Sequence, residues 1–216
     1  MWNGQLDLVS DAAEYLTGCL LEMAEAETNP VLEVIDIPLL ENKKYPPEFL
    51  TFNQLGWRAY YHCHPSSRAG NHRFKGEHGH FHIFVRLKNS SSDEEEWSHL
   101  VALAMDNLGQ PLGWFSVNHW VTGEKWQAAE SLIKYLDEIP YEQDDETILV
   151  ETWLLSLLAL SRDKVKNVLF ERDNTLNKIQ TKKPEVDMKQ NRDIYLLSEK
   201  AINLMDLLNI SKNNIL

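Results

Sequence analysis

Hydrophobic residues recur at three- and four-residue spacings over residues 5–26, and this pattern predicts an amphipathic helix. Pro30 follows soon afterwards, as is common beyond the end of a helix. From residue 30 to residue 47 short apolar pieces alternate with prolines. This indicates an extended or irregular connection, because proline cannot donate a hydrogen bond to a strand ladder.

Four later segments show strand patterns, in which apolar and polar residues alternate or short apolar runs are bounded by turn residues. They span residues 56–64, 78–88, 100–106 and 111–121. A helix is then expected from a cap at Thr122 to about residue 138. The last third predicts a long, largely buried helix over residues 147–170, a polar hinge over 171–191 and an amphipathic helix over 194–208.

This order of elements predicts an α+β fold. The expected architecture is an about four-stranded, mainly antiparallel sheet packed with an N-terminal helix and long C-terminal helices. Residues 1–140 are expected to form an α+β domain that carries the histidines. Residues 141–216 would be a helical extension packed on that domain, so that the whole chain forms one compact unit.

The chain has eight histidines, all between residues 62 and 119. In the second predicted strand His78, His80 and His82 occupy alternate positions, so a regular strand places them on one face. In the first strand the same alternation places His62 and His64 together. Two histidines separated by one strand residue project side by side, which is a good arrangement for clamping a metal ion.

The loop between these two strands allows them to pair, which would bring both sets of histidines to one place. Residues i and i+4 of a strand lie about 13 Å apart, so one metal ion would take two histidines of the triplet and one from the first strand. Three ligands leave a coordination position open, which is typical of a catalytic site. Neutral imidazoles favour zinc or iron, with copper or nickel as alternatives. The expected metal ligands are drawn from His62, His64, His78, His80 and His82.

Two residues near the histidines are candidates for acid–base catalysis. Glu77 directly precedes the triplet and could also complete a mixed ligand set. His119 follows the fourth strand, with Glu124 close behind it as a further ligand or acid–base group. His99 is expected to be an ordinary hydrogen-bonded residue.

Basic residues coincide with the histidines. Residues 57–88 carry six basic residues and one acid, a local charge of +5 in a chain whose net charge is −12. A positive field inside an acidic protein favours a small anion over a nucleic acid. Guanidinium groups bind carboxylate or phosphate bidentately, so substrate binding is expected from Arg58, Arg68, Arg73 and Arg86. The alternative is that these are solvated residues at a sheet edge.

Composition narrows the class of protein further. Two cysteines do not suggest a disulfide framework. Neither a secretory leader nor an apolar run of bilayer length is evident. The expectation is a soluble, cytoplasmic protein that binds neither nucleic acid nor membrane. The sequence does not specify its oligomeric state.

Two resemblances add to this interpretation. The run His78-Gly79-His80-Phe81-His82 resembles the alternating signature of the histidine-triad nucleotide hydrolases and transferases. That resemblance implies a metal-free mechanism with His80 as the nucleophile; it departs from the signature at Gly79, where an apolar residue is expected. The wider pattern YYHCHP, EHGHFHIFVRL, HLVALAMD and NHWVTGEKW, over residues 57–130, resembles an uncharacterised family of bacterial proteins and implies no activity.

The sequence therefore favours a metal-dependent enzyme, a hydrolase or an oxidoreductase, that acts on a small anionic substrate. A histidine-triad-like nucleotide hydrolase or transferase is the first alternative. A non-catalytic metal- or ligand-binding protein, with a closed coordination sphere, is the second.

Overall fold

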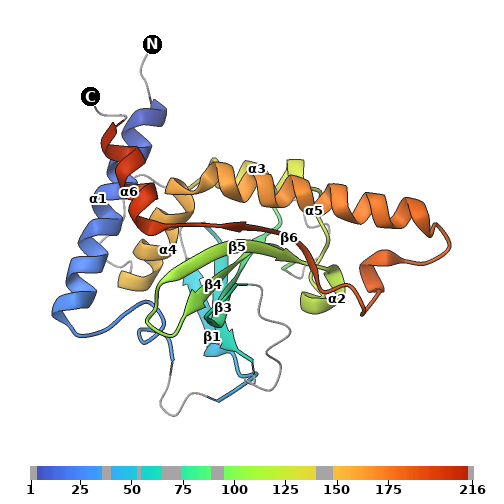
Figure 1. The fold of residues 1–216 in the computed structure, drawn as a ribbon, viewed down its shortest axis with the longest axis horizontal. Coiled ribbons are helices and arrows are strands. Elements are labelled where there is room, and N and C mark those ends of the chain that lie inside the picture. The colour runs from blue at the N-terminus through green and yellow to red at the C-terminus, as the bar shows by residue number, and fades with distance from the viewer. Residues whose placement is uncertain are drawn as a thin grey trace.

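The computed structural model describes residues 4–35, 40–52, 55–64, 74–88, 95–139 and 148–213, without the side chains of residues 4–9 and 210–213. Six strands form one antiparallel sheet in chain order: β1 Tyr45–Phe52, β2 Trp57–Cys63, β3 Glu77–Arg86, β4 Trp97–Asp106, β5 Pro111–Val117 and β6 Leu196–Ala201 (Figure 1). The helices are α1 Gly4–Glu25, α2 His119–Thr122, α3 Ala129–Leu136, α4 Leu149–Leu160, α5 Arg162–Lys182 and α6 Leu204–Asn213, with a short 3₁₀ helix at Met188–Gln190. The α+β class and the antiparallel sheet are confirmed.

One face of the sheet is covered by α1, α3, α4 and α5, and the main core lies between them (Figure 1). Alternation predicts which residues of the two histidine strands point into this core. The core residues there are Trp57, Ala59 and Tyr61 of β2 and Phe81, Ile83 and Val85 of β3. Each such large side chain stabilises the fold by about 1.5–3 kcal/mol on burial. The histidines are thereby directed to the opposite face.

The sheet has two strands more than the four that were predicted, and both extra strands are edge strands. β1 begins at Tyr45 within the segment expected to be irregular, and its pairing with β2 is interrupted between Tyr45 and Leu50. An edge strand tolerates proline because one side of its backbone has no ladder partner. β6 replaces the first half of the predicted final helix and pairs with β5. The last third of the chain therefore contributes to the sheet.

The helical predictions need three corrections. α3 begins at Ala129, because Thr122 ends the short helix α2 instead of starting a long one. The helix predicted over residues 147–170 is divided at Ser161, whose hydroxyl accepts a hydrogen bond of 2.7 Å from Nε1 of Trp114. α5 then continues to Lys182 through most of the predicted hinge. None of the described helices combines the length and apolarity that a membrane crossing requires.

Candidate metal centre

Five histidines from neighbouring strands gather on the sheet face opposite the helices. His62 of β2 lies directly across the ladder from His80 of β3, so the expected pairing of these strands is confirmed. The other members of this histidine cluster are His64 just after β2, His82 of β3 and His99 of β4. Small residues make room for the imidazoles on β4, where Ala104 is opposite His80 and Ala102 is opposite His82.

Three members of the cluster form a group that can hold a metal ion. One ring nitrogen from each of His62, His64 and His80 lies within 4.8 Å of the others. The Nε2 atoms of His62 and His80 are only 2.6 Å apart. Two nitrogens bound to tetrahedral zinc are about 3.3 Å apart, from zinc–nitrogen distances of about 2.0–2.1 Å. The three nitrogens therefore lie within about 1.5 Å of the mutual spacing that one tetrahedral cation requires.

Glu77 determines which nitrogen of His80 is available to a metal. Its side chain is 1% exposed, and Oε1 lies 3.0 Å from Nδ1 of His80. A carboxylate only accepts hydrogen bonds, so Nδ1 of His80 carries a proton, and whenever the ring is neutral its lone pair is on Nε2, which faces His62. Metal-binding histidines commonly donate their other N–H to such a carboxylate, which fixes the ring and raises its basicity. The backbone N–H of Phe74 donates to Oε2 of Glu77 at 3.4 Å and helps to hold the carboxylate.

A β-bulge brings Glu77 to this face and moves His78 away from it. Between β3 and β4 the register passes from Glu77 opposite Asp106 to Gly79 opposite Met105, so His78 is an extra residue without a partner on β4. Nδ1 of His78 instead lies 2.7 Å from the hydroxyl of Tyr61, whose ring belongs to the helix-covered face. The expectation that His78, His80 and His82 share one face is therefore wrong for His78.

His99 is hydrogen-bonded, as expected, and a second bulge places it in the histidine cluster. Ile83 pairs with Val101, but the next residue of β3, Phe84, pairs with His99. Regular alternation from Val101 would have turned His99 into the helix-covered core. The bulge turns it to the histidine face, where Nε2 lies 2.9 Å from Nδ1 of His82. Burial, and to a lesser extent the positive charge of Arg172, lowers the pKa of His99 to about 3, so its ring is neutral.

Two of the four arginines expected to bind substrate are described, and each is paired with a carboxylate. Nη2 of Arg58 lies 3.0 Å from Oε1 of Glu124, and its guanidinium stacks 4.3 Å from the ring centroid of Phe49. Arg86 is half-exposed at the far end of β3 and pairs with Glu95 at 2.8 Å. Both arginines therefore neutralise carboxylates of the protein. Arg68 and Arg73 lie outside the described residues.

His119 is separated from the metal-binding group. It begins α2, and its Nδ1 lies 2.9 Å from Nε2 of Gln190. A narrow pocket lined by both His119 and His99 connects its surroundings to the edge of the histidine cluster. The structure therefore brings together Glu77 and four of the five predicted ligands, and places His119 beyond His99.

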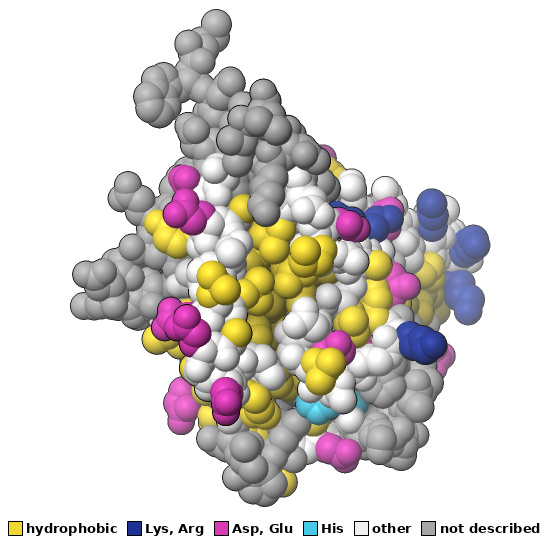
Figure 2. Space-filling view, turned by 60° about the vertical axis from the view of Figure 1, so that its left-hand side comes forward, with side chains coloured by type: hydrophobic (Ala, Val, Ile, Leu, Met, Phe, Trp, Pro, Cys, Tyr) yellow, Lys and Arg dark blue, Asp and Glu magenta, His cyan; other side chains and the backbone are white. Residues whose placement is uncertain are grey.

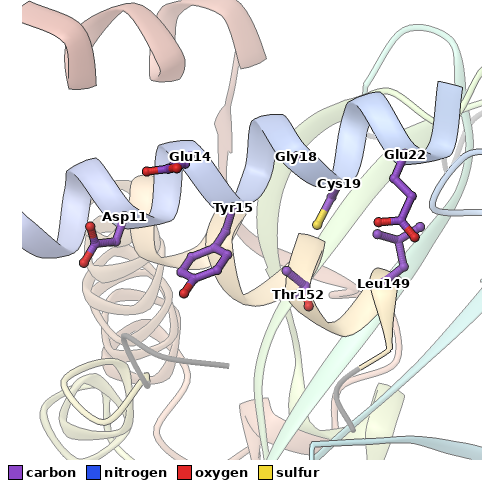
Figure 3. A pocket seen from close by; sticks show the side chains of 8 residues that line it. All are labelled: Asp11, Glu14, Tyr15, Gly18, Cys19, Glu22, Leu149 and Thr152. Atoms are coloured by element: carbon purple, nitrogen blue, oxygen red, sulfur yellow. The ribbon is translucent and has the colours of Figure 1, made fainter. Parts of the chain in front are cut away.

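A larger groove lies elsewhere, between α1 and α4, with a volume of about 510 Å³ (Figure 3). On the side of the molecule where α1 lies, apolar side chains gather in a hollow with acidic side chains around it (Figure 2). The residues lining the groove are Asp11, Glu14, Tyr15, Gly18, Cys19, Glu22, Leu149 and Thr152. Burial, together with the charge of Glu22, raises the pKa of the Cys19 thiol to about 11, so a thiolate nucleophile is not available there near neutral pH.

Comparison with protein families shows to which family the chain belongs. A family model described as Domain of unknown function (DUF6969) matches residues 10–202. The chain belongs to this family. The DUF6969 match runs from within α1 to just beyond β6, so it includes the whole sheet and every residue of the histidine cluster. The expectation of an uncharacterised family is confirmed, over a wider range than residues 57–130.

No curated protein and no solved structure gave a match to this chain. The resemblance to the histidine-triad enzymes finds no support in the geometry, because His78 is turned toward Tyr61 while His80 lies between Glu77 and His62. The name DUF6969 states no activity. The case for function rests on the arrangement of the histidine cluster.

Proposed function

We propose that this protein is a metal-dependent enzyme whose metal ion is held by His62, His64 and His80. The observation that carries the proposal is the approach of the Nε2 atoms of His62 and His80 to 2.6 Å, with Glu77 behind the second ring. This combines convergent ring nitrogens with a carboxylate that orients one of the rings. Zinc or iron is the expected metal, since both accept imidazole ligands and leave a position open in three-histidine sites.

The reaction proposed is a hydrolysis at that open position, or an oxidation in which a co-substrate such as dioxygen accepts the electrons. A bound metal ion would act as a Lewis acid and lower the pKa of a coordinated water to about 7. The residues of the chain would orient the metal and exclude bulk water, since His80 and His82 are 0% and 1% exposed. A small substrate fits this buried setting better than a polymer does.

The substrate proposed is a small anion, and two observations support this class. Residues 57–88 are locally positive in an acidic chain, and a bound cation would add to that field. Because Arg58 and Arg86 already pair with Glu124 and Glu95, the arginines that remain candidates for the substrate are Arg68 and Arg73. Arg68 follows His64 by four residues in the sequence, and Arg73 precedes Glu77 by four.

Reconstitution tests this function. Protein stripped with a chelator is compared before and after addition of Zn²⁺ or Fe²⁺, on a panel of small phosphate and carboxylate esters and oxidisable carboxylates. We expect turnover only after metal addition, its loss in His62→Ala, and its retention in His78→Ala, which removes a histidine of the same strand pair outside the group. Turnover that survives chelation would contradict the proposal.

A further inference from the structure

The ring of His82 lies about as far from the rings of His62 and His80 as the ring of His64 does, although the group of nitrogens within 4.8 Å of one another holds His62, His64 and His80 alone among the described residues. The ring centroids of His82 lie 4.8 Å from His80 and 5.1 Å from His62. The corresponding distances for His64 are 5.1 Å and 4.7 Å. His64 and His82 thus each lie beside both central rings, those of His62 and His80.

His82 is also supported in the way that His80 is supported. In each of these two histidines of β3, Nδ1 contacts a buried residue. Nδ1 of His80 lies 3.0 Å from Oε1 of Glu77, and Nδ1 of His82 lies 2.9 Å from Nε2 of His99. When Nδ1 of a neutral imidazole donates a hydrogen bond, the lone pair that can bind a metal is on Nε2. The second bulge between β3 and β4 turns His99 to this face and so brings it into contact with His82.

We propose that His82 is a fourth ligand of the metal centre and that His99 is the residue that positions it. This rests on the proposed metal site of His62, His64 and His80 and extends it. In this arrangement Nε2 of His99 would accept a hydrogen bond from the Nδ1–H of His82, with the proton of His99 on its own Nδ1.

The surroundings favour a fixed position for this pair. His99 is 9% exposed, and its ring centroid lies 5.3 Å from that of Phe84. The ring of His82 lies 6.2 Å from Phe84 and 6.4 Å from Phe115. A fourth imidazole completes the tetrahedral sphere of zinc, whereas iron still has positions open for substrate. The extended site therefore favours iron as the catalytic metal.

The test compares the affinity for Co²⁺ and Zn²⁺ of the full chain and its variants, and records the visible absorption of bound Co²⁺, which reports the number and geometry of its ligands. Loss of a partner that orients a metal ligand typically lowers metal affinity about 10- to 100-fold. We expect His99→Ala to lower the affinity for both ions by this factor and to change the visible spectrum of bound Co²⁺. His99→Gln, whose side-chain amide can occupy the place of Nε2, should recover most of it. Phe84→Leu is the control, because it reduces packing against His99 and leaves both imidazoles in place.

A double-mutant cycle shows whether His99 acts through His82. If it does, His82→Ala with His99→Ala binds metal no more weakly than His82→Ala alone. Additive losses, or an unchanged affinity and spectrum in His99→Ala, would overturn the proposal while the three-histidine site stands. A wild-type protein that binds neither ion contradicts the proposed function, and the positioning role of His99 falls with it.

Discussion

Gly79 offers the sharpest test of the local geometry that directs the histidines. A Cβ atom built on Gly79 would lie 2.5 Å from the carbonyl oxygen of His62 and 2.7 Å from Cζ of Tyr61, and closer still to the Tyr61 hydroxyl. Ordinary contacts of this kind begin at 3.4 Å. Gly79→Ala therefore forces β2 and β3 apart beside the pair of His62 and His80, or displaces the buried Tyr61 ring.

The expected cost follows from these two conflicts. Inserting a methyl group into a packed site typically costs about 1–3 kcal/mol. Disturbing the hydrogen bond between Tyr61 and His78 adds about 1 kcal/mol. We expect Gly79→Ala to lower the free energy of unfolding by about 2–4 kcal/mol, which corresponds to a fall of about 4–16 °C in the melting temperature for a chain of this size.

Denaturant and thermal unfolding of the metal-free protein, followed by circular dichroism, measure this cost. Gly18→Ala is the matched control, because Gly18 lies inside α1 and a Cβ there would meet nothing within 4 Å. It should raise the free energy of unfolding by about 0.5–1 kcal/mol. Adding Tyr61→Phe to Gly79→Ala should recover part of the loss, since the hydroxyl conflict is removed. If the free energy of unfolding of Gly79→Ala were within about 0.5 kcal/mol of the wild-type value, the close approach of Tyr61 and β2 to Gly79 would be refuted.

Three further predictions concern Glu77, Cys19 and Arg86. Glu77→Gln should weaken Zn²⁺ binding about 10- to 100-fold in a competition titration with a chromogenic chelator, because Nδ1 of His80 loses its carboxylate; unchanged binding would exclude the orienting role. Folding raises the pKa of Cys19 from 9.0 to about 11, so the folded protein holds the thiol proton to higher pH than the unfolded chain does. The free energy of unfolding therefore keeps its full value below pH 9 and falls as the pH rises through about 11. Alkylation of native Cys19 should therefore stay slow at pH 8 and accelerate only near pH 11, whereas rapid native alkylation at pH 8 would contradict its burial. Arg86→Ala breaks an exposed ion pair with Glu95, so unfolding measurements should show a change of less than about 1 kcal/mol, and a larger loss would indicate an undetected role.

Alternation along β2 and β3 was sufficient to predict the buried face of these strands and the meeting of a histidine of the first strand with the triplet, which the structure shows as His62 opposite His80. It failed where the sheet departs from strict alternation. The bulge at His78 exchanged that residue for Glu77 on the histidine face, and the bulge beyond Ile83 brought in His99. Bulges depend on how neighbouring strands pair, so the periodicity of a single strand does not reveal them.

The edge strands were missed for a related reason. β1 contains Pro46 and Pro47, which are compatible with a strand only where one side of the backbone needs no partner. β6 was hidden in a segment with helical spacing of Leu197, Ala201 and Leu204, and only its pairing with β5 makes the first part a strand. Tertiary pairing overrode local pattern in both cases.

Metal content of the protein purified without a histidine tag tests the central claim most directly. Elemental analysis after equilibration with Zn²⁺ or Fe²⁺, followed by desalting, should give about one metal ion per chain for wild type. The same measurement should give little or none for His62→Ala and His80→Ala, and about one for His78→Ala. Wild-type protein that retains no metal, or His62→Ala and His80→Ala variants that retain as much as wild type, would contradict the account.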